Sequence, residues 1–175
     1  MDIREVIKTV NRMQADGVIE NYAIGGAVGA TFFLEPMATL DVDIFTRLQP
    51  EPGSVIVNPT RIFDYLKAHG GVMEGEYIVL DGWPVQFLPP AGALVEEALA
   101  EAVHVDVDGV PARVFSAEHL AAIALQVGRA KDKARLLQFV ESGVLDAARF
   151  QAILARHGLE AAWLRFQRQF IGDES

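Results

Sequence analysis

The 175-residue sequence contains no cysteine, has fewer basic than acidic residues, and has no long hydrophobic run. Without cysteine, disulfide bonds and thiolate metal sites are excluded, so a hydrophobic core must stabilise the fold. The length suits one compact domain, or a domain with a small appendage. Lys and Arg total 15 against 24 Asp and Glu, a net charge of −9. This balance argues against sequence-independent coating of DNA, which depends on Lys and Arg, but it does not exclude binding of a nucleotide.

Hydrophobic targeting segments are also missing. The first ten residues carry charges at positions 2, 4, 5 and 8, which excludes the apolar core of a secretory signal. An uncharged stretch at residues 21–34 is too short and too rich in glycine for a membrane span, which needs roughly 20 apolar residues. We therefore expect a soluble, cytoplasmic protein with no membrane attachment.

Residues 1–45 predict a helix, a strand, a glycine pair, a second helix and a second strand. Hydrophobic residues at positions 3, 6, 7, 10 and 13 recur with helical spacing, and Gly17 ends that helix. The expected elements that follow are a strand at residues 21–24 running into Gly25 and Gly26, a helix at residues 27–34 ended by Pro36, and an alternating strand at residues 40–45.

Two tight turns organise the middle of the sequence. Asp81-Gly82 and Asp108-Gly109 accept the positive φ angles of hairpin turns and are flanked by β-prone residues. Asn58 or Thr60 is the expected N-cap of a nearby helix. The expected elements are a loop at residues 50–53, a helix at residues 61–68 that stops at Gly70-Gly71, hairpins at residues 77–83 and 104–114, a strand at residues 85–88 and a helix at residues 91–100.

Only helices are predicted after residue 114. Ser116 and Asp146 are good N-caps for two of them. The expected helices are an apolar run at residues 120–127, a helix at residues 131–140 ending at Gly143, a helix from Asp146 to Gly158, and a helix at residues 159–170. We therefore expect an α+β fold with a mixed β-sheet flanked by helices at residues 1–114, followed by a C-terminal helical bundle at residues 115–175.

Charge divides near the same position. Residues 1–112 hold 6 basic and 17 acidic side chains, a net charge of −11, whereas residues 113–175 hold 9 and 7, a net charge of +2. The run at residues 129–135 alone has four basic residues and one acid. We therefore expect a phosphate-bearing partner to bind where an acidic strand faces the helices.

Asp41 and Asp43 form the first candidate site for chemistry. One residue separates them on a predicted strand, so both carboxylates project from the same face. Two acids at this distance repel each other, and a divalent cation between them relieves the repulsion. Mg²⁺ prefers oxygen ligands and is commonly held by one or two carboxylates together with substrate phosphates. A solvated strand face explains the same pattern without a metal.

Gly25 and Gly26 form the second candidate site. Glycine lets the backbone approach a phosphate closely, and the amides at a helix start favour an anion. A simple turn of the chain between a strand and a helix is the alternative. Together with the aspartate strand that follows, the glycine pair predicts a phosphate-binding turn beside a metal site.

A series of motifs runs in order through most of residues 20–140. It comprises Tyr22-Ala23-Ile24-Gly25-Gly26-Ala27, Pro36, Thr39, Asp41-Val42-Asp43-Ile44-Phe45, Ser116-Ala117-Glu118-His119-Leu120 and Arg129-Ala130-Lys131-Asp132. This series resembles the minimal nucleotidyltransferases of the polymerase-β-like superfamily. Within that superfamily it is most similar to the AbiEii-type branch, best known as toxins of toxin–antitoxin pairs.

The resemblance implies a nucleotidyltransferase-like mixed sheet and Mg²⁺-dependent transfer of a nucleoside monophosphate from an NTP. The implied acceptor is an RNA, such as tRNA, or a protein, and an antitoxin is an implied partner. The implied site residues are Asp41 and Asp43 for catalysis and Mg²⁺, Gly25 and Gly26 for the triphosphate, and Arg129 and Lys131 for phosphate or acceptor. A solvated helix end is the alternative for the two basic residues.

Four positions depart from the family pattern. The third carboxylate of the family, expected on a later strand, corresponds to Gln86. Its amide oxygen can ligate a cation but cannot accept a proton from an attacking hydroxyl. The other departures are Met37 for an arginine, Ala124 for a lysine and Arg135 for an acid, and the residues that could replace the missing acid are Glu74, Glu76 and Asp81. The alternative functions are a catalytically degenerate binding or regulatory protein of the same fold, and an unrelated α/β domain.

Other polar and aromatic residues are expected to be structural. Asp108 of a second Asp-x-Asp pair is assigned to a hairpin turn, because a glycine follows it. The four histidines lack metal-ligand spacing and are expected at the surface or at caps, and His119 receives no catalytic role. Trp163, Phe166 and Phe170 share one helix face and are expected to pack in the core, with a groove for a partner as the alternative.

Overall fold

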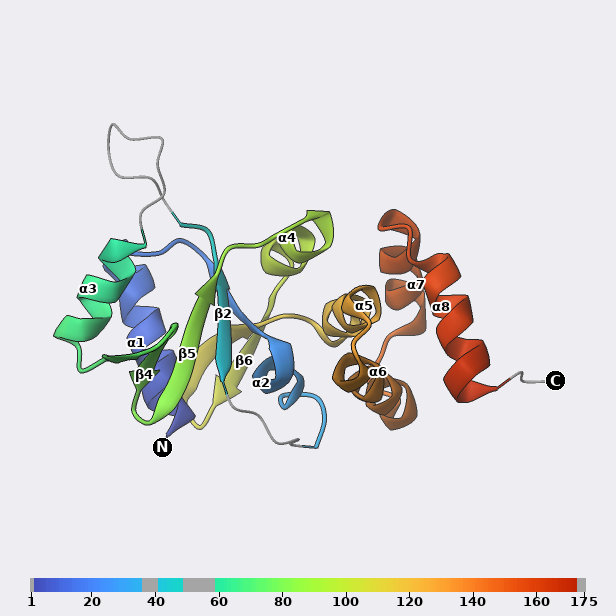
Figure 1. Ribbon diagram of the computed structural model, residues 1–175, viewed down its shortest axis with the longest axis horizontal. Helices are drawn as coiled ribbons and strands as arrows, with labels where there is room; N and C mark the ends of the chain where they lie inside the picture. The colour runs from blue at the N-terminus through green and yellow to red at the C-terminus, as the bar shows by residue number, and fades with distance from the viewer. Residues whose placement is uncertain (1, 36–40, 49–58, 173–175) are drawn as a thin grey trace.

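The computed structural model describes residues 2–35, 41–48 and 59–172, which form an α+β fold (Figure 1). Within these ranges the strands are β1 (Tyr22–Gly25), β2 (Val42–Thr46), β3 (Val72–Glu74), β4 (Tyr77–Leu80), β5 (Trp83–Leu88), β6 (Val103–Val107) and β7 (Val110–Val114). They form a single mixed sheet in the spatial order β3-β4-β5-β2-β1-β7-β6. The expected α+β fold, with a mixed sheet flanked by helices, is confirmed.

Helices cover the sheet and continue beside it. They are α1 (Ile3–Ala15), α2 (Gly26–Ala30), α3 (Thr60–Ala68), α4 (Ala93–Ala100), α5 (Ala117–Val127), α6 (Ala130–Ser142), α7 (Ala147–Arg156), α8 (Glu160–Phe166) and the π-helix η1 (Gln167–Ile171). The helices from α5 onward form the expected C-terminal bundle (Figure 1). None of the helices in the described ranges is both long enough and apolar enough to cross a membrane.

The two faces of the sheet bury different sets of side chains. Val42 and Ile44 of β2 belong to a cluster that includes the buried residues of α1 and α3. Phe45, on the opposite face of the same strand, packs against a second cluster on the side of α4 and α5. This alternation turns Asp43, between Val42 and Ile44, toward the C-terminal helices.

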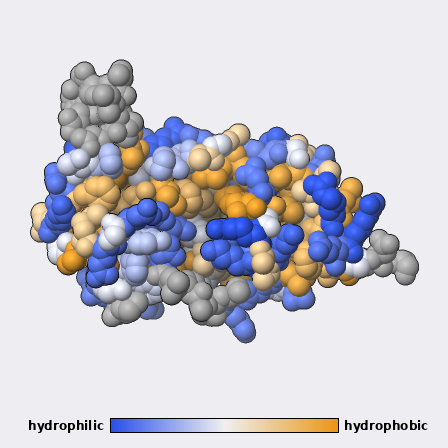
Figure 2. All heavy atoms as spheres, viewed as in Figure 1, coloured by the Kyte–Doolittle hydropathy of each residue, from blue (hydrophilic) through white to orange (hydrophobic). Residues whose placement is uncertain are grey.

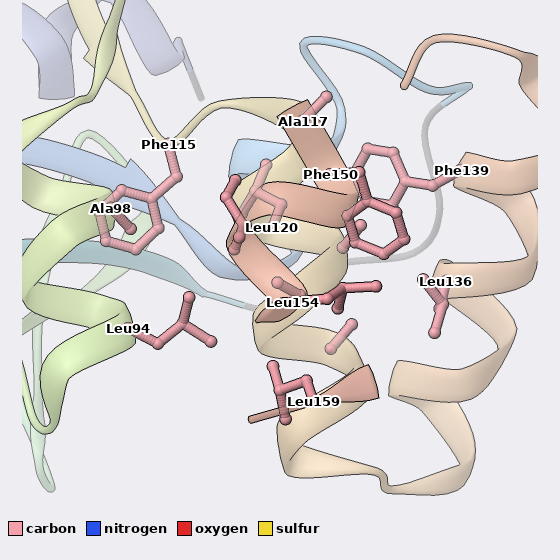
Figure 3. Close-up of a cluster of buried hydrophobic side chains, with 14 of the residues drawn as sticks. Leu94, Ala98, Phe115, Ala117, Leu120, Leu136, Phe139, Phe150, Leu154 and Leu159 are labelled. Carbon is pink, nitrogen blue, oxygen red and sulfur yellow. The ribbon is translucent and has the colours of Figure 1, made fainter. Parts of the chain in front are cut away.

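The second cluster spans the change in composition at residue 114, where β7 ends. Figure 3 shows that α5 is surrounded by side chains from both sides of this position, with Leu94 of α4 on one side and Phe139 and Phe150 of α6 and α7 on the other. Phe115, directly after β7, is 1% exposed. The sheet and the helical bundle therefore share one continuous hydrophobic core.

The first helix and the strand after it form as expected, but the second helix is shorter than predicted. Helix α2 contains five residues rather than spanning residues 27–34, and residues 31–34 form turns. Thr31 is β-branched and its hydroxyl donates to the carbonyl of Val28 at 2.6 Å, and the two phenylalanines that follow have modest helix propensity. Pro36, its expected terminator, and Leu40 lie outside the described residues.

Both Asp-Gly hairpins are confirmed. The φ angles are +47° at Asp81 and +82° at Gly82, and the second hairpin repeats them with +50° at Asp108 and +86° at Gly109. No sequence pattern predicted β3, which pairs antiparallel with β4 at the edge of the sheet. All three residues of β3 are exposed, so its sequence carries no alternation between buried and exposed positions.

The caps of the later helices are confirmed, and one earlier cap is wrong. Ser116 accepts from the backbone N–H of His119, and Asp146 accepts from that of Arg149. Thr60 is the first residue of α3 rather than its cap, because Pro59 occupies the N-cap position without a side-chain hydrogen bond. Asn58 and the loop at residues 50–53 lie outside the described residues.

The last predicted helix changes its geometry before it ends. Trp163 and Phe166 are buried as expected, whereas Phe170 is 39% exposed, which corrects its placement in the core. The wider turns of η1 end the strict helical spacing after Phe166. Phe170 instead lies against the ring of Phe166 at a centroid distance of 4.9 Å, with the ammonium group of Lys133 above it.

Candidate active site

A row of residues crosses the centre of the sheet. Gly25 of β1 pairs with Asp43 of β2, and Asp43 in turn pairs with Gln86 of β5 in a parallel ladder. Asp41 lies directly before β2, and Val42 between the two aspartates is fully buried on the other face. Both carboxylates line one pocket, so the prediction that they share a face is confirmed.

The glycine pair packs directly against this row. Gly26 has a φ of +59°, and a Cβ at this position would overlap Oδ2 of Asp43. A Cβ at Gly25 would lie 2.6 Å from Cε2 of Phe45. Glycine is therefore required for space at both positions and for backbone conformation at Gly26, and the start of α2 lies against the Asp43 carboxylate.

Basic residues from the helical bundle line the same pocket. Gly128 ends α5 in the left-handed conformation, and Arg129 is the N-cap of α6, so the chain turns sharply between the two helices. The turn brings Arg129, Lys131 and Arg135 into the pocket with the aspartates. The site thus draws Asp41 and Asp43 from the sheet and its basic residues from α6.

The electrostatics of Asp43 reflect both sets of charges. Burial and the neighbouring Asp41 carboxylate raise the pKa of Asp43 to about 6, while Lys131, Arg135 and Arg129 act in the opposite direction. A carboxylate with a raised pKa lacks a cation close enough to compensate its charge. A divalent ion between Asp41 and Asp43 would supply that compensation.

Asp132 and Arg135 also line the pocket, although neither was predicted to act in the site. Asp132 is 2% exposed and accepts from Nε of Arg129 at 2.6 Å, and Nη1 of Arg135 lies 3.7 Å from its other carboxylate oxygen. Asp132 therefore orients the two guanidinium groups rather than facing a ligand alone. Acids and arginines three residues apart on a predicted helix are a sequence signal that could have identified this cluster.

The rest of the pocket wall is hydrophobic. Its apolar and aromatic lining comprises Ala27, Phe45, Tyr77, Leu88, Phe115, Leu120, Ile123, Ala124 and Val127. The pocket has a volume of about 450 Å³, within the range of small-molecule sites. Figure 2 shows strongly hydrophilic residues next to hydrophobic ones in the middle of the face where β2 faces α5 and α6 in Figure 1. The pocket can therefore hold a planar apolar group beside a polyanion and a cation.

The structure also bears on the departures from the family pattern. Gln86 lines the pocket beside Asp43, whereas Glu74, Glu76 and Asp81 are not among the lining residues. Asp81 instead lies in a hairpin turn, where its carboxylate accepts from the backbone N–H of Asp2. Ala124 lines the pocket and is buried, and Met37 lies outside the described residues.

His119 is not the surface or cap side chain that the sequence predicts. It is fully buried, its Nδ1 lies 2.7 Å from the hydroxyl of Ser116, and its Nε2 lies 2.8 Å from a carboxylate oxygen of Glu97. Among the described residues, His119, Glu97 and Glu101 are the one group of at least three His or acidic side chains close enough to share a metal. Arg156 already binds Glu97 at 2.8 Å, so the group is an ion-pair network joining α4, α5 and α7.

The assignment of the second Asp-x-Asp pair to a turn is confirmed. Asp106 accepts from the backbone N–H of Gly109 at 2.8 Å, and Asp108 adopts the positive φ of the hairpin. Neither aspartate lines the pocket.

Comparison with known proteins gives matches in structure and none in sequence. No family model and no curated protein matches the chain. The crystal structure of ANT(2'')-Ia in complex with adenylyl-2''-tobramycin aligns with a TM-score of 0.53 at 16% identity, over 93% of this chain and 98% of that one. A solution structure of the antibiotic-resistance factor ANT(2'')-Ia aligns with a TM-score of 0.54 at 17% identity, over 97% of this chain and 99% of that one. The crystal structure of an antigenic nucleotidyltransferase-like protein from Paracoccidioides brasiliensis aligns with a TM-score of 0.53 at 14% identity, over 91% of this chain and 90% of that one.

These alignments cover nearly the whole of both chains, sheet and helical bundle together. At this level of identity they establish the fold alone. The chain has the nucleotidyltransferase fold.

Proposed function

We propose that the protein is a Mg²⁺-dependent nucleotidyltransferase that binds an NTP in this pocket and transfers its nucleoside monophosphate to an acceptor. One observation carries the proposal: Asp41 and Asp43 face Arg129 and Lys131 across a pocket whose floor includes Gly26, within a nucleotidyltransferase fold. Carboxylates on one wall and cations on the other suit a metal-bound triphosphate between them.

The donor set fits magnesium. Two carboxylates and the amide oxygen of Gln86 supply hard oxygen ligands, and Gly26 leaves open the space that a Cβ would occupy beside Asp43. Asp41 and Asp43 would hold the ion. Magnesium, when bound, neutralises charge that develops on the triphosphate.

The other residues bind and orient the triphosphate. Gly26 lines it at the start of α2, with Gly25 directly before it against the ring of Phe45, and Arg129 and Lys131 neutralise its phosphates from α6. Asp132 holds the guanidinium group of Arg129 in place. The acceptor oxygen attacks the α-phosphorus in line with the leaving group, a new P–O bond forms there, and the bond to pyrophosphate breaks.

The resemblance in sequence and the structural comparison suggest different acceptors. The AbiEii-type motifs at residues 116–120 and 129–132 favour an RNA, such as tRNA, or a protein as acceptor, and an antitoxin as partner. The complex of ANT(2'')-Ia carries an adenylyl group on the small molecule tobramycin. An RNA, a protein extract and small molecules are therefore the acceptors to test.

A second candidate function rests on Gln86. Because the third position of the catalytic row is an amide, a protein that binds nucleotide and Mg²⁺ without transferring the nucleotide is the alternative. Such a protein would act as a binding or regulatory module of the same fold.

The melting temperature tests the binding step. Mg²⁺ together with one of the four NTPs should raise it for the wild type and not for the Asp41→Asn/Asp43→Asn variant. Asp64→Asn, at an exposed position of α3, is the matched control. Unchanged melting with every nucleotide would refute the proposal. Incubation with [α-³²P]NTP, tRNA and cell extract then separates transfer from binding alone.

A further inference from the structure

Among its described lining residues, the pocket offers no uncommitted proton acceptor to an attacking hydroxyl. Its acidic lining residues, within the described ranges, are Asp41, Asp43 and Asp132. The first two are the metal ligands of the proposed function. Asp132 is buried and committed to Arg129 and Arg135. No histidine lies among the described lining residues.

Gln86 is the neutral polar residue in the row that crosses the sheet at the pocket. It lies beside Asp43 on the neighbouring parallel strand, on the pocket wall. An amide accepts hydrogen bonds at its oxygen and donates two at its nitrogen, but it does not take up a proton at neutral pH. A general base contributes typically about 10²- to 10⁴-fold to the rate of such a step.

An acceptor that is already an anion does not need a base. A phosphate monoester carries about −1.5 to −2 charges at pH 7, whereas an alcohol remains protonated. The N–H groups of Gln86 can donate to an anionic oxygen, which a carboxylate at the same position would repel. Lys131 and Arg135 supply positive charge on the opposite wall.

We propose that the acceptor is a phosphate monoester, and that Gln86 positions its anionic oxygen for attack. This inference rests on the proposed function and names its acceptor class. The phosphate oxygen forms a bond to the α-phosphorus of the NTP, the bond to the β-phosphate oxygen breaks, and pyrophosphate leaves. The product contains a new diphosphate linkage, and no proton has to be removed from the acceptor.

The test compares an anionic and a neutral acceptor in two variants. The wild type with Mg²⁺ and each NTP should transfer the nucleotide to inorganic phosphate, giving the nucleoside diphosphate, at least about tenfold faster than to glycerol. Gln86→Glu, which is nearly isosteric, should lose transfer to phosphate and gain about 10²-fold in transfer to glycerol. Gln151→Glu, at an exposed position of α7, is the matched control.

Two further measurements guard against a folding defect and identify the source of the phosphate. Gln86→Asn keeps the amide and should keep the preference for phosphate. Inorganic phosphate should further raise the melting temperature of the wild-type complex with Mg²⁺ and an α,β-methylene NTP, and should not do so for Gln86→Glu. One RNA oligonucleotide with a 5′-phosphate or a 5′-hydroxyl distinguishes an RNA end from free phosphate.

The outcomes separate the two proposals. If the wild type transfers the nucleotide to glycerol or to the 5′-hydroxyl RNA as fast as or faster than to the matching phosphate acceptor, the proposal of a phosphate acceptor is overturned. The proposed nucleotidyltransferase function would still stand. Transfer by Gln86→Glu alone would also overturn the phosphate acceptor, and would support nucleotide binding without catalysis in the wild type. Failure of Mg²⁺ and NTP to bind at all would refute the proposed function itself.

Discussion

The charge on Asp43 should cost the metal-free protein part of its stability. Burial and repulsion by Asp41 raise the pKa of Asp43 from 3.8 to about 6. A pKa raised by about two units means that ionising Asp43 costs about 3 kcal/mol more in the folded protein than in the unfolded chain. Asp43→Asn keeps the size of the side chain and removes the charge, so above pH 7 it should stabilise the metal-free protein by up to about 3 kcal/mol.

The pH dependence has a definite sign. Between about pH 4 and pH 6, Asp43 holds its proton in the folded state and has lost it in the unfolded state, so the free energy of unfolding falls as the pH rises. Above pH 6 this contribution is constant. The free energy of unfolding of Asp43→Asn should not show this decline. The difference in that free energy between the variant and the wild type should therefore shrink toward zero near pH 4.

Denaturant unfolding in EDTA at pH 4.5, 6 and 8 measures this difference. A gain of about 3 kcal/mol corresponds to roughly 6–12 °C in melting temperature for a chain of this size. Mg²⁺ should stabilise the wild type and leave Asp43→Asn unchanged, because the ion needs the carboxylate. Asp64→Asn on the surface should change stability by less than about 0.5 kcal/mol. An Asn variant that is less stable than the wild type in EDTA at pH 8 would refute the electrostatic argument.

Three other substitutions test separate parts of the structure. Gly26→Ala should abolish NTP binding in a thermal-shift assay and should lower the free energy of unfolding more than Gly75→Ala does. Both positions have a positive φ, but only Gly26 lies against Asp43. Equal losses in the free energy of unfolding would contradict the steric argument. Lys131→Ala should weaken NTP binding about tenfold in calorimetry, because Lys131 supplies positive charge to the pocket; an unchanged affinity would exclude that role. Hydrogen bonds from Arg156, and then from two histidines, lower the pKa of Glu97 to about 2. Glu97→Gln should therefore lower the free energy of unfolding at pH 7, and it should reduce the loss of that free energy between about pH 4.5 and pH 2. Acid unfolding curves of the same shape for both proteins would count against this network.

Local chemistry explains why much of the fold was predictable. Asp81-Gly82 forms a hairpin turn because both residues accept positive φ, and Ser116 caps α5 through a hydrogen bond three residues away. The common face of Asp41 and Asp43 follows from the two-residue period of a strand. Each of these features depends on residues within a few positions of one another, so the sequence displays it directly.

The features that the sequence missed depend on distant or solvent-facing residues. His119 is buried by its contact with Glu97, which lies 22 positions away on another helix. All three residues of edge strand β3 are exposed, and the strand forms because β4 offers it a partner. The family resemblance identified Gln86 as the counterpart of a carboxylate, but its position beside Asp43 was not predicted, since the register of a parallel ladder is set by the whole sheet rather than by either strand.

The division of charge along the sequence becomes a division across the pocket. The acidic half contributes Asp41 and Asp43, and the basic run of α6 lies close enough to Asp43 to act on its pKa. Among the described lining residues only α6 contributes positive charge, and Asp132, the one acid that it places there, is paired with Arg129 and Arg135. The pocket therefore depends on the docking of α5 and α6 against the sheet, which the shared core around Phe115 and the contacts of His119 and Glu97 maintain. A change that loosened this docking would separate Asp41 and Asp43 from Arg129 and Lys131, and the proposed function predicts that activity would then be lost before either half unfolded.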